Sequence, residues 1–256
     1  MSALLEVKDL RVSFRQDGKI TQAVRGVSFT VGRGETVALV GESGSGKSVS
    51  ALSTVSLLGD SAIVEGSVTY DGDQMIGASE QRLMEVRGND ISFIFQEPMT
   101  SLNPLHTIEK QLAESLALHQ GLDGSAARAR ILELLTQVGI RDPETRLGAY
   151  PHQLSGGQRQ RVMIAMALAN KPDILIADEP TTALDVTIQA QILELLADLK
   201  TQEDMGLLFI THDLGIVRRI ADRVCVMKDG EIGETGPTEM ILDNPQHPYT
   251  RMLLEA

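Results

Sequence analysis

The sequence contains little cysteine, few aromatic residues and no long apolar run. Its single cysteine among 256 residues, Cys225, excludes a disulfide framework and a cysteine-based metal site within the chain. No stretch approaches about 18 uncharged apolar residues, the length that predicts a transmembrane helix. Glu6, Asp9 and Arg11 interrupt the apolar pattern of residues 1–20, which argues against a signal peptide. These absences favour a cytosolic protein, with Cys225 as a buried and unreactive thiol in an apolar strand.

Basic residues are also scarce relative to acidic ones. The chain has 23 Lys and Arg against 35 Asp and Glu, a formal net charge of −12. This balance argues against a protein that binds a nucleic-acid backbone, so we expect no nucleic-acid partner. The hydrophobic content of 42% is ordinary for a globular protein. The length predicts one large α/β domain, or such a domain with one insertion.

Residues 41–48 carry the clearest pattern in the chain. They read GESGSGKS and fit G-x-x-x-x-G-K-[ST], the phosphate-binding loop. Residues 36–40 predict a buried strand before it, and residues 49–58 predict a helix after it. Backbone N–H groups and the helix N-terminus would face the phosphates, with Lys47 reaching the β- and γ-phosphates and Ser48 holding Mg²⁺. The alternative is a Gly/Ser-rich turn that matches by chance, and the flanking strand and helix disfavour it.

Residues 154–158, Leu-Ser-Gly-Gly-Gln, predict a second anion site of the same physical type. Ser155 is a suitable N-cap for a helix predicted over 159–170. The two glycines leave the helix N-terminus sterically open. Because this segment has no lysine, it would bind phosphate weakly by itself. It makes sense if it meets a phosphate that is already held elsewhere.

An apolar strand predicted over 174–178 ends in two carboxylates. Ligands bind at the carboxyl ends of strands in α/β sheets, so these acids are candidates for a site. Asp178 suits a Mg²⁺-holding role, and Glu179 suits the role of orienting and deprotonating a water molecule. The alternative is a solvated strand end.

Three further residues are candidates with structural alternatives. Gln96 follows a strand predicted over 91–95 and would reach a metal or water there, or would be only a polar strand end. His212 follows a strand predicted over 206–210, which favours a site over the usual structural role of a lone histidine. Phe14, at the end of the first strand, would stack on a base or pack as a core or edge aromatic.

The order of predicted elements gives the architecture. Strands over 4–14 and 23–31 predict an antiparallel opening, and no strand pattern occurs from Pro98 to Gln153. Helices over 107–119 and 125–139 therefore form an insertion in a β-containing domain. The remaining predictions are strands over 66–72, 223–228 and 231–232, and helices over 81–86, 214–221, 237–242 and 249–254, with another helix starting at 182.

These segments, in this order, resemble the ATP-binding-cassette ATPases over about residues 4–245. Residues 41–48 are similar to the Walker A loop, Leu154–Gln158 to the signature, and Ile174–Asp178 with Glu179 to Walker B and the catalytic glutamate. Gln96 resembles the Q-loop residue, Asp185 lies in a D-loop-like Ala-Leu-Asp, and His212 resembles the switch histidine. The signature pentapeptide is the specific signal, because other phosphate-loop proteins lack it.

The resemblance implies an α/β fold: a phosphate-loop ATPase core with an antiparallel β subdomain and an inserted α-helical subdomain. Its expected boundaries are 1–96 and 172–245 for the core, 97–171 for the helical subdomain and 246–256 for a tail. It implies ATP hydrolysis with Glu179, His212 and Gln96 in catalysis, and Mg²⁺ at Ser48, Gln96 and Asp178. The implied ATP-binding residues are Phe14, Gly41, Ser43, Gly44, Ser45, Gly46, Lys47, Ser48, Ser155, Gly156, Gly157, Gln158 and Asp185.

Within that family the likeness is to peptide and nickel importer ATPases, on the stretches 96–104, 150–153 and 244–250. It implies a second cassette packed head to tail, separate membrane permease subunits, a solute-binding protein acting indirectly, and a peripheral place on the cytoplasmic face of the inner membrane. Both a short form and the first half of a tandem ATPase remain open. The alternatives are an exporter cassette, a cassette ATPase acting on DNA or ribosomes, and a phosphate-loop kinase or GTPase.

Overall fold

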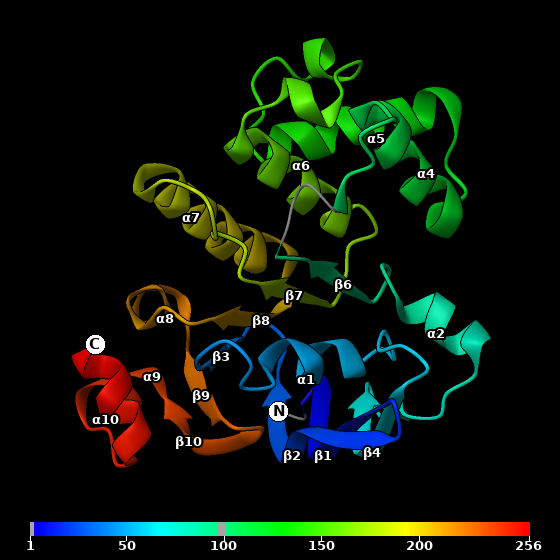
Figure 1. The fold of residues 1–256 in the computed structure, drawn as a ribbon. Helices are drawn as coiled ribbons and strands as arrows, with labels where there is room; N and C mark the ends of the chain where they lie inside the picture. The colour runs from blue at the N-terminus through cyan, green and yellow to red at the C-terminus, as the bar shows by residue number, and fades with distance from the viewer. Residues whose placement is uncertain (1–2, 97–100) are drawn as a thin grey trace. The chain divides into compact units, whose positions relative to one another are not determined.

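A computed structural model of the chain describes residues 3–96 and 101–256 and divides into two compact units. The first unit comprises Met1–Val86 and Asp204–Ala256, and the second comprises Arg87–Glu203. Figure 1 shows the elements of each unit. The division expected at residues 96, 171 and 245 stays a prediction, and residues 97–100 of the importer-like stretch lie outside the described ranges. Among the helices of those ranges, none has the length and apolar character needed to span a membrane.

The first unit opens with an antiparallel sheet, as predicted. Strands β1 (Leu5–Gln16) and β2 (Lys19–Val31) form a hairpin, and β4 (Ala62–Tyr70) pairs with the other edge of β1. The two-residue strand β5 (Asp73–Gln74) completes the order β2-β1-β4-β5. Alternating burial along β1 and β2 places one face of this sheet against the core.

A second group of strands in the first unit is parallel at its centre. Strand β3 (Thr36–Val40) is buried at every residue and lies between β8 (Gly206–Thr211) and β9 (Arg223–Lys228), parallel to both. Strand β10 (Glu231–Pro237) runs antiparallel to β9. Such apolar strands are typical of parallel sheets covered on both faces.

In the described part of the first unit, the structure has five helices: α1 (Lys47–Ser53), α2 (Glu80–Val86), α8 (Leu214–Ile220), α9 (Thr238–Asp243) and α10 (Pro248–Glu255). Helices α9 and α10 lie beside β9 and β10 (Figure 1). Cys225 of β9 is 1% exposed, and its Sγ is 3.4 Å from Thr235 Oγ1. The predicted burial of Cys225 is confirmed, and burial raises the pKa of its thiol, which favours the protonated form.

The described residues of the second unit, 87–96 and 101–203, include a pair of parallel strands and the helical insertion. Strand β6 (Ile91–Ile94) pairs in parallel with β7 (Ile174–Asp178). Helices α4 (Ile108–Gln120), α5 (Gly124–Gln137) and α6 (Gly156–Leu168) pack together through buried apolar faces. Helix α7 (Val186–Glu203) follows β7, and the short 3₁₀ turns η1 (Pro143–Arg146) and η2 (Pro151–Gln153) precede α6.

Several element boundaries differ from the predictions, two of them near the phosphate loop and in β4. The helix after the phosphate loop ends at Ser53 instead of residue 58, because the hydroxyls of Ser53 and Thr54 donate back to Ser50 O and Ala51 O at 2.8 and 2.6 Å. Strand β4 begins at Ala62, so Gly66 is inside the strand and not at its start. The pairing of β1 with β4 is irregular at this point, because its register shifts between Lys8 and Arg11 of β1. A Cβ on Gly66 would clash with the backbone O of Asp9, so the irregularity requires glycine there.

Candidate functional site

The phosphate loop connects β3 to α1 in the first unit, as the pattern predicted. Two of its glycines are required by geometry. A Cβ on Gly41 would clash with the backbone O of Met227, and one on Gly46, where φ is +99°, would lie 2.9 Å from Ala23 O. A residue outside the loop also contacts it, since Gly230 N donates to Ser45 O at 3.0 Å. Neighbouring backbone therefore holds the loop in one shape.

Lys47 is the first residue of α1, and its side chain folds back into the loop. Its Nζ donates to Gly41 O at 2.6 Å, to Glu42 O at 2.9 Å and to Ser45 Oγ at 3.4 Å. The residue is only 6% exposed. Lys47 therefore places a buried ammonium inside the loop, where the phosphates of a nucleotide would bind.

Strand register brings His212 to the same sheet edge as the phosphate loop. Val40, the last residue of β3, pairs with Thr211, the last residue of the parallel strand β8. Gly41 and His212 each follow directly, and parallel strands present their carboxyl ends together. Asp213 then caps α8, with its Oδ1 accepting from Gly215 N at 2.8 Å. The prediction that His212 follows a buried strand is confirmed, and its role at the site stays a prediction.

Phe14 lies in β1 opposite Thr21 of β2 and Ala62 of β4. Its side chain is half-buried on the antiparallel sheet. This exposure leaves ring surface for a base to stack on, and the structural alternative of an edge aromatic also fits it.

In the second unit, the same register argument applies to Gln96 and Asp178. Ile94 of β6 pairs with Ala177 of the parallel strand β7. Asp178 is the last residue of β7, and Gln96 is exposed two residues beyond the end of β6. The structure thus brings the amide of Gln96 and the carboxylates of Asp178 and Glu179 to one strand edge.

Glu179 has a conformation that is uncommon for a residue other than glycine. Its φ is +48°, in the left-handed region, which costs about 1–2 kcal/mol for a residue with a Cβ. Thr182 stabilises the turn: its N–H donates to Glu179 O at 3.2 Å, and its Oγ1 donates to Glu179 Oε2 at 3.3 Å. Sequence reasoning did not single out Thr182, although a Ser or Thr in a turn is a recognised signal.

The signature segment begins α6 with a capping box. Ser155 Oγ accepts from Gln158 N at 3.2 Å, and Gln158 Oε1 accepts from Ser155 N at 2.9 Å. The N-cap prediction for Ser155 is confirmed, but the helix starts at Gly156 and not at Arg159. Gly156 and Gly157 therefore form its first turn. Because the capping box uses the N–H groups of Ser155 and Gln158, the N–H groups of Gly156 and Gly157 in the first turn are the candidate anion donors of this segment.

Close packing restricts position 157, but not position 156, to glycine. A Cβ on Gly157 would lie 2.9 Å from Ile188 Cγ2, whereas one on Gly156 would lie 3.6 Å from Leu184 Cδ2. Asp185 precedes α7 and accepts from Ile188 N through Oδ1 at 2.9 Å. The helix expected from residue 182 thus starts at Val186, after a turn in which Ala183 has a φ of +66°.

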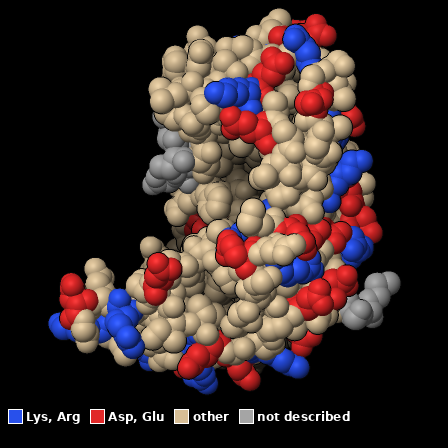
Figure 2. All heavy atoms as spheres, turned by 90° about the vertical axis from the view of Figure 1, so that its right-hand side faces the viewer, with Lys and Arg blue, Asp and Glu red and all other residues tan. Residues whose placement is uncertain are grey.

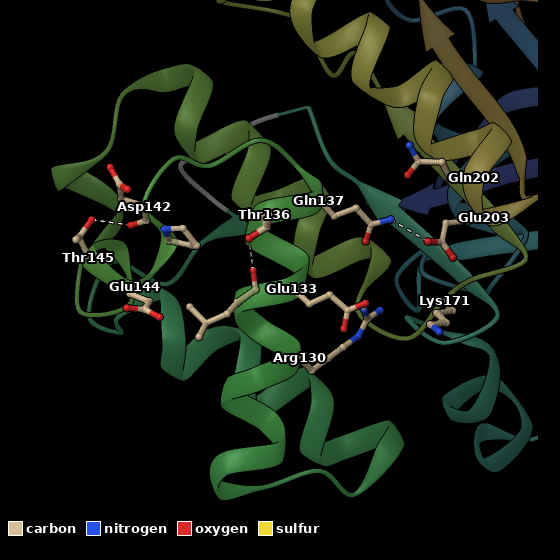
Figure 3. Close-up of a pocket in the computed structure, with 12 residues that line it drawn as sticks. Arg130, Glu133, Thr136, Gln137, Asp142, Glu144, Thr145, Lys171, Gln202 and Glu203 are labelled. Atoms are coloured by element: carbon tan, nitrogen blue, oxygen red, sulfur yellow. Dashed lines mark hydrogen bonds and ion pairs between the residues drawn. The ribbon is translucent and has the colours of Figure 1, made fainter.

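A separate hollow of about 750 Å³ lies in the second unit (Figure 3). Gln137 Nε2 donates to Glu203 Oε1 there at 2.8 Å. None of its lining residues is a predicted site residue, and carboxylates outnumber cations among them, so it does not suit a nucleotide phosphate. The lining residues are Arg130, Leu132, Glu133, Thr136, Gln137, Asp142, Pro143, Glu144, Thr145, Lys171, Gln202 and Glu203.

The donor set of the candidate residues fits Mg²⁺ better than a soft metal. Ser48, Gln96 and Asp178 offer hydroxyl, amide and carboxylate oxygens, which are the hard ligands that Mg²⁺ prefers. No group of three or more His, Cys, Asp and Glu side chains in residues 3–96 and 101–256 is arranged to hold a metal. Mg²⁺ commonly binds through one or two protein groups plus substrate phosphates, so the oxygen donors of these residues are chemically compatible with it.

A family model described as ABC transporter matches residues 24–182. The chain belongs to the ABC transporter family. It is 66% identical over 255 residues to the peptidoglycan transport ATP-binding protein YejF of Agrobacterium fabrum, covering 99% of this chain and 47% of that protein. It is 52% identical over 258 residues to the oligopeptide transport ATP-binding protein OppD of Bacillus subtilis, covering 100% of this chain and 72% of that one.

Solved structures agree with the fold predicted from the family resemblance. The chain superimposes with a TM-score of 0.81 and 32% identity on the ATP-binding cassette MJ0796, solved as a dimer in a post-hydrolysis state with ADP and Pi. The match covers 91% of this chain and 98% of that one. The chain spans about half the length of the first curated relatives that it matches, at 47% and 48%.

Proposed function

We propose that this ABC-family chain binds ATP with Mg²⁺, hydrolyses the ATP, and thereby energises uptake of peptides or related small solutes through a membrane permease. The observation that carries the proposal is the phosphate loop with Lys47 buried in it, in a chain that also has the capped signature helix. Relatives named for oligopeptide and peptidoglycan transport support the solute class.

The proposed roles follow from the chemistry of each side chain. Lys47 and the loop N–H groups of Gly41–Ser48 bind the phosphates, and Phe14 stacks on the base. Ser48, Gln96 and Asp178 hold Mg²⁺, which when bound neutralises charge on the phosphates. Glu179 orients the attacking water and takes its proton, while His212 stabilises the γ-phosphate.

The signature suggests a role toward a second cassette. Its helix N-terminus bears a partial positive charge without a lysine. We propose that Ser155–Gln158 covers the γ-phosphate of ATP held by a second ATPase domain, in the same or a different chain, with Asp185 at the same contact. MJ0796, which the chain resembles, was solved as a dimer.

The proposed setting is peripheral, on the cytoplasmic face of the inner membrane, with permease subunits as direct partners and a solute-binding protein as an indirect one. Nucleic acid is not a proposed partner. Figure 2 supports this, since acidic side chains are interspersed with basic ones on the face that it shows. The alternative is an ABC ATPase of a non-peptide transporter, or a non-transport one. Co-purification with membrane-embedded subunits separates these functions.

The test is the mass of the Glu179→Gln chain in solution with and without ATP, together with its phosphate release. We expect retained ATP binding, turnover reduced at least roughly 100-fold, and an ATP-dependent dimer. Glu194→Gln, an exposed carboxylate on α7, is the matched control and should leave turnover unchanged. Unchanged turnover in Glu179→Gln would remove Glu179 from catalysis.

Adding Ser155→Arg to Glu179→Gln tests the role in trans. A large cation at the helix N-terminus should leave ATP binding by one chain intact and abolish the dimer. A dimer that persists at the wild-type level would contradict this role. A Glu179→Gln chain that binds ATP and stays monomeric would show that its second cassette is a different one.

A further inference from the structure

The C-terminal helix contacts the phosphate loop through a tyrosine hydroxyl. Tyr249, in the first turn of α10, has its OH 3.1 Å from the backbone N of Glu42, which donates to it across 207 residues of sequence. Tyr249 is 4% exposed. Glu42 is the second residue of the phosphate loop, so a segment at the far end of the chain holds a loop amide.

The same loop residue also binds Lys47. Glu42 N donates to Tyr249 OH, and Glu42 O accepts from Lys47 Nζ at 2.9 Å. Two hydrogen bonds therefore connect the tyrosine hydroxyl to the ammonium through one residue of backbone. Any shift of Glu42 changes the position of an oxygen that binds Lys47.

The tyrosine ring is held firmly enough to act as an anchor. It packs in an apolar cluster with Val40 at the end of β3, Val226 of β9 and Ile241 of α9. Lys228 Nζ lies 5.0 Å from the ring centroid, a cation–π distance. Burial raises the pKa of Tyr249, so its hydroxyl is neutral at physiological pH and free to accept the Glu42 N–H.

The segment before the tyrosine is fixed to strand β10. The Glu234 carboxylate accepts from Gln246 N at 2.7 Å and from His247 N at 3.1 Å. His247 Nδ1 in turn accepts from Tyr249 N at 3.1 Å, which caps α10. A Cβ on Gly233 would lie 3.1 Å from the His247 ring, so that glycine makes room for the cap.

We propose that Tyr249 is a positioning residue of the phosphate loop, whose hydroxyl fixes Glu42 and through it the ammonium of Lys47 for binding the nucleotide phosphates. The proposal rests on the proposed ATP-binding function and adds a residue to it. It also gives the His-Pro-Tyr-Thr stretch, 247–250, a physical role that its pattern alone did not indicate.

The test is Tyr249→Phe, which keeps the ring and removes the hydroxyl. Loss of one net hydrogen bond predicts a roughly three- to tenfold rise in the Kd and KM for ATP, with kcat changed less than about twofold. Amide hydrogen exchange of Glu42 should accelerate in the same variant, because its N–H loses its acceptor. Both measurements use the full chain.

The matched control is Tyr70→Phe, which removes the hydroxyl of another tyrosine that is 4% exposed, on β4. Tyr70→Phe should leave the ATP affinity and the amide exchange rate of Glu42 unchanged, even if it lowers the melting temperature as much as Tyr249→Phe does. Unchanged ATP affinity in Tyr249→Phe, or an equal loss in both variants, would overturn the proposal. A wild-type chain that fails to bind ATP would instead overturn the proposed function on which it rests.

Discussion

The side-chain amide of Gln160 donates a 2.6 Å hydrogen bond to the backbone O of Pro180. Gln160 lies on α6, two residues beyond the signature segment, and is 1% exposed. Pro180 follows Glu179 directly. The bond therefore ties the helix that begins with the signature to the turn that carries the proposed catalytic glutamate, within one unit.

Replacing Gln160 with leucine should destabilise this part of the chain. The change leaves the buried Pro180 carbonyl without its donor, which costs about 1–3 kcal/mol. Urea unfolding followed by circular dichroism measures the free-energy change. The exposed Gln202, at the end of α7, supplies the control Gln202→Leu, which should stay within about 0.5 kcal/mol of wild type. Equal stability of the two variants would contradict the assigned contact.

The two signature glycines should respond oppositely to alanine. Alanine normally stabilises a helix by about 0.5–1 kcal/mol relative to glycine, and Gly156→Ala should follow that rule because its Cβ has ordinary clearance. Gly157→Ala should instead destabilise by about 1–3 kcal/mol, because its Cβ would meet Ile188 Cγ2 at 2.9 Å.

A double-mutant cycle with Ile188→Ala checks the cause of that difference. If the clash is responsible, Gly157→Ala should become neutral or stabilising in the Ile188→Ala background. Thermal unfolding of the four chains provides the measurement. Additive effects would mean that Gly157 is constrained by something other than Ile188.

Glu234, whose carboxylate holds the segment before α10, predicts that the stability of the fold depends on pH in the acid range. Burial by itself would raise the pKa of Glu234, but hydrogen bonds from Gln246 N and His247 N, with the charge of His247, lower it below its ordinary value of 4.5. A lowered carboxyl pKa contributes stability above the unfolded-state pKa, and that contribution is lost as pH falls through the folded-state pKa.

Glu234→Gln should therefore be less stable than wild type near neutral pH, with the difference shrinking as the pH falls from about 6 to about 3.5. Urea unfolding at several pH values in that range gives the comparison. Glu231→Gln is the control, an exposed glutamate on the same strand. If the difference in unfolding free energy between wild type and Glu234→Gln does not change with pH, the assigned carboxylate contacts are wrong.

Local patterns were sufficient to predict the elements that carry the candidate site. The apolar runs 36–40, 174–178 and 206–210 became β3, β7 and most of β8, so Gly41, Glu179 and His212 each follow a buried strand as the pattern predicted. These predictions succeeded because burial and turn chemistry are encoded within a few residues. Helix α1 ended early for a local reason as well, the back-bonding hydroxyls of Ser53 and Thr54.

Contacts between distant segments were not predictable in this way. Tyr249 contacts Glu42 across 207 residues of sequence, and Gly157 lies close to Ile188 on another helix. Both contacts depend on how whole elements pack. A single sequence carries no signal for such pairs. The importance of Gln160 was hidden for the same reason, since a polar residue within a helix usually faces solvent.

The burial of Cys225, the one cysteine among these 256 residues, allows site-directed labelling at introduced cysteines without first replacing a native one. Cys225 is 1% exposed with its pKa raised by burial, so maleimide or nitroxide reagents should react slowly with it. Cysteines introduced at exposed positions, one in each unit, would then carry paired probes without any prior cysteine replacement. The distance between such a pair, measured by spectroscopy with and without ATP, would test whether nucleotide changes the separation of the two units.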